Sequence, residues 1–347
     1  MDNTMIFTHP ADLLPEQLAA SLKDLGQPAF RGKQIFRWLS GGVWDFSAML
    51  NLPLDLREKL AEAWPLAPPE LVKRHISADG TEKYLWQFAD GEKVETVLMR
   101  QPHGDTICIS TQVGCRMGCV FCASTIGGLA RNLTPREMLA QVLFVEQLSG
   151  KQASNIVLMG MGEPLDNFEA VVQFLRLVTH PDGRGLSMRH ITLSTCGMIE
   201  KIDKLANLGL QLTLSISLHG SDDETRGKIM PINKACGVDK LFRSAANYRK
   251  KTGRRVSIEY ALIDGINDRE EQASALAAKC KHGDWHVNLI PLNAIGGTNL
   301  QPSSSEQVAK FARILEKNGV NVTIRRRRGD DIAAACGQLR HNTARRR

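Results

Sequence analysis

The sequence predicts an α/β protein in which a partial (β/α)6-type barrel follows a small N-terminal helical accessory domain. Two observations lead to this prediction. Between residues 107 and 292, short apolar runs of strand length alternate with helical patterns, which is typical of parallel strands joined by right-handed crossovers. Earlier in the chain, four of the five tryptophans provide enough aromatic surface for a separate small core: Trp38, Trp44, Trp64 and Trp86.

Residues 1–90 are assigned to the accessory domain. Apolar periodicity and helix-ending signals predict three helices, at Pro15 to about Gly26, at Phe30–Leu39 and at about Pro53 to Trp64. A turn containing Gly91 then predicts a pair of strands, Thr81–Phe88 and Val94–Arg100.

Residues 91–331 are assigned to the barrel and residues 332–347 to a C-terminal segment with a basic tail. The predicted strands are Ile107–Val113, Asn155–Met161, His190–Thr195, Leu212–Leu218, Val256–Ile263 and His286–Leu292. The predicted helices are Pro135–Leu148, Asn167–Val178, Met198–Leu208, Val238–Lys251, Arg269–Lys281 and Ser304–Lys317, and the last precedes an extended Val320–Arg326. No internal repeat of about 20 to 50 residues suggests a solenoid instead.

Polar and cysteine residues recur where these strands end. Active sites of such barrels form at the carboxyl ends of the strands, so residues from separate regions should meet there. The residues concerned are Cys115, Gly162, Glu163, Ser194, Ser217, His219 and Asn293. We therefore expect them at one mouth of the barrel.

Composition limits the class of protein. The 347 residues are 43% hydrophobic, and no apolar run approaches the roughly 18 residues that a membrane span needs. The start of the chain lacks the basic and apolar regions of a secretory signal. Half of the eight cysteines lie between Cys108 and Cys122, which favours metal or redox chemistry over disulfides. We expect a cytoplasmic enzyme without a membrane partner.

The chain carries a moderate positive charge. Lys and Arg number 44 against 37 Asp and Glu, a formal net charge of +7. The excess is concentrated in two runs, Arg325–Arg328 and Arg345–Arg347. Such runs are more often solvated faces than binding sites, but the charge is compatible with a polyanionic partner.

The strongest chemical signal is the CxxxCxxC spacing of Cys115, Cys119 and Cys122. A zinc site completed by a distant His or Cys is one interpretation, although no second CxxC-type half occurs in the chain. The other is a [4Fe-4S] cluster held by three cysteines, which leaves one iron open to S-adenosylmethionine as a radical source.

A second motif, Gly160–Leu165, reads G-M-G-E-P-L. It imitates the start of a dinucleotide-binding GxGxxG, but Leu165 replaces the third glycine. An anionic Glu163 beside backbone donors suits a zwitterionic amino acid better than a pyrophosphate. Together with CxxxCxxC and its aromatic Phe121, this motif resembles the radical S-adenosylmethionine (SAM) enzymes.

A closer resemblance, to the RlmN-type RNA methyltransferases, covers nearly the whole chain. It is carried by Val94–Thr96, Thr111–Cys115, Met159–Leu165, Leu193–Thr195, Ser217–His219, Met230–Asn233, Asn288–Pro291 and Gly329–Leu339. RlmN-type enzymes methylate carbon 2 of an adenosine in 23S rRNA and in certain tRNAs, whereas the related Cfr type methylates carbon 8 of the same rRNA adenosine. Pro164 and the Gly329-Asp330-Asp331 sequence are more similar to the RlmN type, which favours carbon 2.

The resemblance implies three catalytic residues. Cys336 would accept a methyl group from one SAM, and a radical made from a second would remove a hydrogen from it, so that its carbon adds to the base. Glu95 would accept the base proton. Cys108 would then pair transiently with Cys336 and release the product. Without the resemblance, Glu95 would pass for an exposed strand carboxylate and Cys108 for a buried strand residue.

The resemblance also implies the cofactor and partner set. The cluster ligands would be Cys115, Cys119 and Cys122, and the SAM-binding residues Gly162, Glu163, Ser194, Ser217, Leu218, His219 and Asn293. The partners would be 23S rRNA, tRNA and a reductant protein such as flavodoxin or ferredoxin, and we expect a monomer. A radical SAM enzyme for peptides or small molecules, carbon 8 methylation and a zinc-dependent RNA-binding protein stay open as alternatives.

Overall fold

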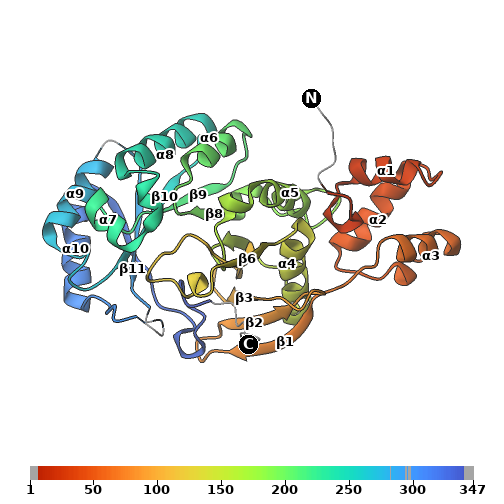
Figure 1. The fold of residues 1–347 in the computed structure, drawn as a ribbon, viewed down its shortest axis with the longest axis horizontal. Coiled ribbons are helices and arrows are strands. Elements are labelled where there is room, and N and C mark those ends of the chain that lie inside the picture. Colours follow the sequence, from red (N-terminus) through yellow and green to blue (C-terminus); the bar gives the residue numbers. More distant parts are fainter. Residues whose placement is uncertain (1–6, 282, 294, 296–297, 340–347) are drawn as a thin grey trace.

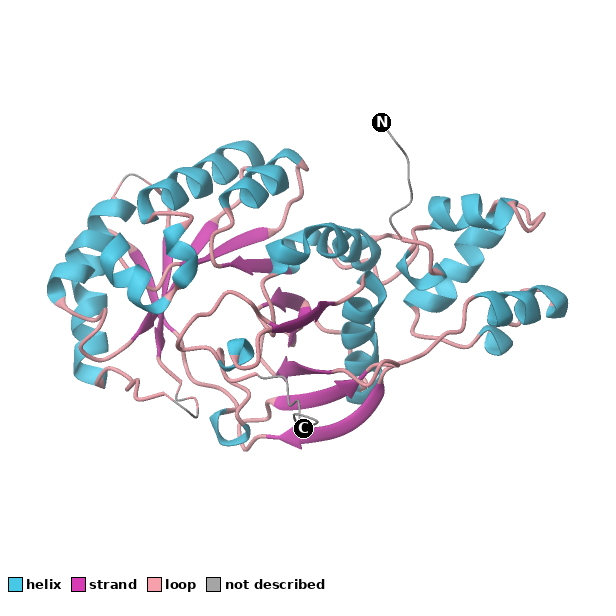
Figure 2. Cartoon of the chain, viewed as in Figure 1, coloured by secondary structure: helices cyan, strands magenta, loops and turns pink. Residues whose placement is uncertain are grey.

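The protein is described here from a computed structural model that covers residues 7–281, 283–293, 295 and 298–339. One ten-stranded mixed sheet organises the chain, in the order β1-β2-β3-β4-β7-β8-β9-β10-β11-β12, and β5 and β6 form a separate two-stranded sheet. Figure 1 shows the helices after β6 around the outside of the curved sheet and α1–α3 to one side of it. Figure 2 shows long loops on the inner side of this curved sheet, and the strands β1–β3 along its lower edge.

The first four strands of the large sheet pair antiparallel and the following ones pair parallel. The antiparallel part comprises β1 (Glu70–Ile76), β2 (Glu82–Gln87), β3 (Lys93–Met99) and β4 (Thr106–Cys108). The parallel part continues with β7 (Asn155–Leu158), β8 (Ile191–Thr195), β9 (Thr213–Ser217), β10 (Val256–Leu262), β11 (His286–Pro291) and β12 (Asn321–Ile324). The small sheet pairs β5 (Gln112–Gly114) with β6 (Leu129–Asn132).

The helices alternate with the parallel strands, as the fold class requires. The N-terminal helices are α1 (Pro15–Lys23), α2 (Phe30–Ser40) and α3 (Leu54–Ala63). The others are α4 (Pro135–Ser149), α5 (Phe168–Thr179), α6 (Ile199–Asn207), α7 (Asp223–Ile229), α8 (Val238–Thr252), α9 (Glu270–Cys280) and α10 (Ser305–Lys317). Every residue of β10 is buried, because helices cover a central parallel strand that has neighbours on both sides.

The predicted α/β fold is confirmed, and among the described residues the large sheet runs from β1 to β12. The predicted strand Ile107–Val113 is wrong in its extent, because β4 ends at Cys108 and β5 leaves the large sheet to pair with β6. Strand β1 was not predicted. The boundary predicted at residue 90 lies in the turn between β2 and β3, which pair in one sheet. The division into units at residues 90 and 331 stays a prediction.

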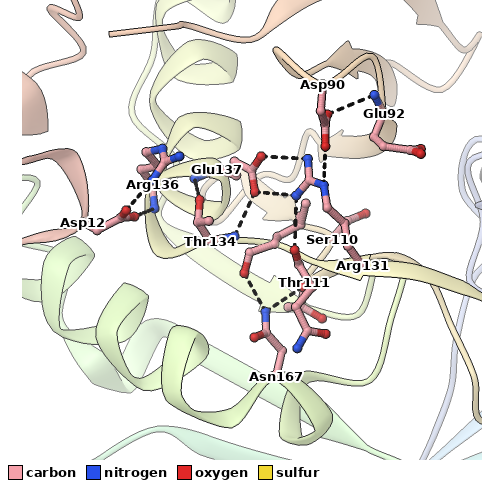
Figure 3. A network of polar contacts seen from close by, with 12 residues as sticks. Asp12, Asp90, Glu92, Ser110, Thr111, Arg131, Thr134, Arg136, Glu137 and Asn167 are labelled. Carbon is pink, nitrogen blue, oxygen red and sulfur yellow. Dashed lines mark hydrogen bonds and ion pairs between the residues drawn. The ribbon is translucent and has the colours of Figure 1, made fainter. Parts of the chain in front are cut away.

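A network of charged side chains fixes the segment around β6 (Figure 3). Arg131 binds Asp90, in the turn between β2 and β3, and Glu137, in the first turn of α4. In the same turn of α4, the backbone N–H and the guanidinium of Arg136 donate to the buried Asp12 at 2.7 and 2.5 Å. These contacts attach the β2–β3 hairpin and the N-terminal unit to the start of α4 and to β6. Strand β6 follows directly after the loop that carries the three clustered cysteines.

Among the described residues, no helix is both long and apolar enough to cross a membrane.

Candidate active site

The CxxxCxxC motif forms the loop between β5 and β6. Gly114 opens the loop with φ +78°, and a Cβ there would lie 2.0 Å from the carbonyl oxygen of Gly128. Glycine is therefore required, and the neighbouring Cys115 N–H donates to that same oxygen at 3.0 Å. At the other end of the motif, the N–H of Cys122 donates to the carbonyl of Cys119 at 3.1 Å, which turns the chain back.

The three thiols of this loop are largely shielded from solvent. Cys115 and Cys119 are buried and Cys122 is half-buried. Burial raises the pKa of Cys115 to about 12 and raises that of Cys119, and the neighbouring thiols of the motif add to both shifts. Three thiols kept close together and away from solvent are suited to binding metal as thiolates, because a bound cation offsets the cost of their charge.

The donor set fits an iron–sulfur cluster. Within the described ranges, no three His, Cys, Asp or Glu side chains converge at the close spacing that a single metal ion needs. In a [4Fe-4S] cluster each cysteine binds a different iron atom, so its sulfurs lie further apart than the ligands of one ion. Three sulfurs from one loop, without a fourth His or Cys among them, are compatible with such a cluster.

Phe121 covers the inner side of the motif. Its ring packs edge-on against His219, with ring centroids 4.8 Å apart. His219 follows β9 with a left-handed φ of +54°, and its Nδ1 accepts the N–H of Ala261 at 2.9 Å. Burial lowers the pKa of His219 to about 3, so the imidazole is neutral and carries its proton on Nε2. The motif thus contacts a strand-end residue that the sequence had placed in the same site.

Glu163 lies in the turn after β7 and is buried, and within the described part of the chain its carboxylate forms no ion pair. Its carboxylate accepts the backbone N–H of Leu165 at 3.0 Å and that of Cys196, after β8, at 2.8 Å. Burial raises the pKa of Glu163 in spite of these donors. A buried carboxylate of this kind is a favourable site for a ligand cation. Gly162, at φ +99°, must be glycine because a Cβ would lie 2.5 Å from Gln112.

The other strand-end residues converge on the same edge. Ser194 of β8 and Ser217 of β9 lie 3.1 Å apart, hydroxyl to hydroxyl. Asn293, after β11, is buried, and its Oδ1 has no hydrogen-bond partner in the described structure. An unpaired buried acceptor is costly unless a ligand supplies a donor. Leu218 differs, because it is fully buried with its backbone bonded to Glu259 and Arg226.

Cys336 lies beside the cysteine loop although the sequence separates them widely. Its carbonyl accepts the Asn293 amide at 3.0 Å, and the carbonyl of the next residue, Gly337, accepts the N–H of Ala123 at 2.7 Å. The side chain is exposed, yet the surrounding protein raises the pKa of its thiol, partly offset by Arg325. Cys336 is therefore accessible from solvent while its backbone is fixed beside the cysteine loop.

Cys108 and Glu95 belong to the neighbouring antiparallel strands. Cys108 of β4 is buried, and burial, followed by the charge of the Cys336 thiolate, raises the pKa of its thiol. Glu95 of β3 forms an ion pair with Lys83 of β2 at 2.9 Å. Lys83 also donates to the carbonyl of Ala333 at 3.0 Å. This bond connects Glu95 to the Cys336 segment, by which we mean Gly329–Leu339.

Family comparisons agree with this geometry. A model of the radical SAM superfamily matches residues 109–277, and a model of the ribosomal RNA large subunit methyltransferase N-terminal domain matches residues 11–65. A probable dual-specificity RNA methyltransferase RlmN of Lachnoclostridium phytofermentans is 49% identical over 94% of this chain and 92% of its own length. One from Clostridium botulinum is 48% identical over 95% and 96%. The chain belongs to the RlmN family of radical SAM RNA methyltransferases.

Structural comparison supports the same family. A crystal structure of a radical SAM methyltransferase from Sphaerobacter thermophilus matches with a TM-score of 0.91 and 41% identity, over 96% of this chain and 99% of its own. The prediction of an RlmN-type radical SAM methyltransferase is therefore confirmed. The roles of its individual residues stay predictions.

Sequence reasoning missed two polar residues, Arg226 and Gln112, that hold the loops of this RlmN-family site together. Arg226 of α7 is fully buried, and its guanidinium donates to the carbonyls of Leu218 and Cys196 at 3.0 and 2.5 Å. It thereby joins the ends of β8 and β9. Gln112 accepts the N–H of Glu163 at 2.8 Å and orients that turn. No periodicity in the sequence marks either residue, because their partners are backbone groups of distant loops.

Part of the predicted basic run Arg325–Arg328 is bonded to the protein itself. Arg327 and Arg328 donate to the carbonyls of Leu292 and Arg100 at 3.0 and 3.2 Å, so part of the run Arg325–Arg328 anchors the chain to the sheet. The run Arg345–Arg347 lies outside the described residues. All eight cysteines are free thiols.

Proposed function

We propose that this enzyme methylates carbon 2 of an adenosine in 23S rRNA and in tRNA, through a methylated Cys336 and a covalent RNA intermediate. The observation that carries the proposal is the position of Cys336: its carbonyl accepts the Asn293 amide, and the carbonyl of the next residue, Gly337, accepts the N–H of Ala123, which follows Cys122 of the cysteine loop. The names of its relatives, dual-specificity RNA methyltransferases, support action on both kinds of RNA.

The proposed cofactor site uses the residues that converge on the strand ends. Cys115, Cys119 and Cys122 would hold a [4Fe-4S] cluster. Gly162, Glu163, Ser194, Ser217, Leu218, His219 and Asn293 would hold SAM, Leu218 through shape rather than hydrogen bonds. When bound, the cluster and SAM supply a 5′-deoxyadenosyl radical, with two SAM consumed per turnover. Glu163 would pair with the methionine ammonium group and Asn293 Oδ1 would accept a donor from the ligand.

The chain's own residues then divide the remaining work. Carbon 2 of adenine is a poor nucleophile, so the methyl group is first carried by the sulfur of Cys336. After one hydrogen is removed from that methyl group, its carbon bonds to the base. The adduct gives up one electron, which the cluster, oxidised when it cleaved SAM, would take back, and it gives up the base proton, which Glu95 accepts. Cys108 then attacks the sulfur of Cys336, the carbon–sulfur bond breaks, the released carbon takes up a proton, and a disulfide forms that a thiol can reduce.

The proposal extends to the state of the RNA substrate and to the partners. The target base must leave its stack to reach the Cys336 thiol. An enzyme that acts on rRNA and tRNA is expected in the cytoplasm. A flavodoxin- or ferredoxin-like protein would supply its electrons. We propose that the enzyme is a monomer. Carbon 8 methylation, as in the Cfr type, is the alternative product.

Nucleoside analysis tests the proposal. The enzyme, purified anaerobically, is incubated with unmodified 23S rRNA and tRNA, SAM and a reductant, and the digested RNA is analysed by mass spectrometry against both methyladenosine standards. We expect 2-methyladenosine from both RNAs and iron in the protein. Only 8-methyladenosine would assign the enzyme to the Cfr type, and a zinc protein without product would support an RNA-binding role.

Glu163→Gln should weaken SAM binding by about 10- to 100-fold, the range expected for a lost hydrogen bond between charged groups. Oε1 accepts the N–H of Leu165 and Oε2 that of Cys196, so the amide keeps only one of these two acceptors and has no charge for the ammonium. Equilibrium dialysis with labelled SAM measures the change. Glu316→Gln removes an exposed glutamate of α10 and is the matched control. Unchanged affinity in Glu163→Gln would remove this residue from the cofactor site.

A further inference from the structure

Lys83 is a nearly buried lysine that no part of the mechanism above uses. Only 8% of it is exposed. Its Nζ lies 2.9 Å from Oε1 of Glu95 and 3.0 Å from the carbonyl oxygen of Ala333. Burying an ammonium group is costly, and a direct ion pair with a further hydrogen bond offsets that cost. Both partners of this ammonium belong to the proposed catalytic machinery or to the segment that carries it.

The sheet register places Lys83 on the catalytic face. Lys83 is opposite Val97 of β3, and Val97 is opposite Cys108 of β4, so these three side chains form one row across the sheet. Glu95 is two residues from Val97 and therefore shares that face. Lys83, Glu95 and Cys108 thus lie on one surface, the surface that the Cys336 segment covers.

The Cys336 segment is fixed at both ends by other groups. At its start, Asp331 accepts the Ser77 hydroxyl at 2.6 Å, and the N–H of Gly329 donates to Asp79 at 3.1 Å. At its end, the Ser124 hydroxyl donates to the carbonyl of Leu339 at 2.6 Å. Lys83 contacts the middle of the segment, at Ala333, a non-glycine residue with a left-handed φ of +50°. The bond to Lys83 supports this strained position, three residues before Cys336.

We propose that Lys83 is a positioning residue, which holds the Glu95 carboxylate and the Cys336 segment in register so that the base proton can be removed from the RNA adduct. The inference rests on the function proposed above. One ammonium group joins the carboxylate that accepts the proton to the backbone that carries the adduct. Proton removal, rather than radical formation or methyl loading, is therefore the step that depends on Lys83.

The experiment measures methylation with RNA that carries hydrogen or deuterium at carbon 2 of the target adenosine. Lys83→Met keeps most of the side-chain volume and removes the charge. We expect a rate about 10- to 100-fold lower, the range for a lost hydrogen bond to a charged group. We also expect a larger deuterium isotope effect than in the wild type, because proton removal becomes rate-limiting. Lys83→Arg, which retains charge and donors, should recover part of the rate and lower the isotope effect again.

Two control variants separate positioning from simple anchoring. Asp331→Asn weakens an anchor of the segment that does not contact Glu95, and it should leave the isotope effect at the wild-type value. Lys73→Met removes an exposed lysine of the adjacent strand β1 and controls for one lost positive charge. Iron content and thermal melting are measured for every variant, so that a folding defect is recognised.

The outcomes are distinct. A wild-type rate in Lys83→Met, or a reduced rate with an unchanged isotope effect as in Asp331→Asn, would overturn the role of Lys83. If the wild-type enzyme forms no 2-methyladenosine, the proposed function fails instead.

Discussion

Cys336→Ala is expected to abolish RNA methylation while the variant still cleaves SAM reductively. The substitution removes the sulfur that carries the methyl group and leaves the cysteine loop and Glu163 in place. The rate of RNA methylation is expected to fall by at least about 10³-fold, as it does when other residues that form a covalent intermediate are removed. Mass spectrometry of nucleosides and of 5′-deoxyadenosine from the same reaction measures both activities.

The matched control for Cys336→Ala is Cys280→Ala. Cys280 is buried at the end of α9, and burial alone raises the pKa of its thiol to about 12. Its loss should leave methylation unchanged. Normal methylation by Cys336→Ala would refute a methyl-carrying role for this residue, whatever the other variants show.

Cys108→Ala is expected to accumulate a covalent complex of protein and RNA. Without the second thiol, nothing attacks the sulfur of Cys336, so the carbon–sulfur bond of the adduct persists. Free methylated RNA should fall by at least about 10²-fold, an effect on the scale of a lost catalytic group. A denaturing gel with labelled RNA separates the complex from free RNA, and ribonuclease treatment confirms its composition.

The double variant Cys108→Ala with Cys336→Ala is the control for the trapped complex. It lacks the sulfur that attaches the RNA, so the slow-migrating band should disappear. Free methylated RNA produced by Cys108→Ala at the wild-type rate would remove Cys108 from the mechanism.

Most of the fold was accessible from local sequence patterns. Helix α5 and strand β10 differ from their predictions by a residue or so at each end, because apolar periodicity dominates long, buried elements. Strand β1 escaped prediction because it is an exposed edge strand without clean alternation. Helix α7 escaped because seven residues capped by Asp222 give a short and weakly apolar pattern.

The site was accessible only where it follows strand ends or a recognisable motif. Glu163 and Asn293 were placed by the rule that barrel sites form at the carboxyl ends of strands. Lys83 needed the register of β2 against β3, which pairs it diagonally with Glu95. Arg226 needed the three-dimensional positions of distant carbonyls. Neither kind of information is present in spacing along the chain.

The anchoring of the Cys336 segment also affects the order of folding. Its hydrogen bonds join residues far apart in the chain, by 254 positions for Ser77 with Asp331 and by 215 for Ser124 with Leu339. Contacts at such separation form late, because the intervening chain must be ordered first. The segment is attached by these bonds and by the buried side chains of Ala334 and Leu339 to a sheet that does not include it. The reactive sulfur therefore reaches its position only after the sheet and the cysteine loop have formed.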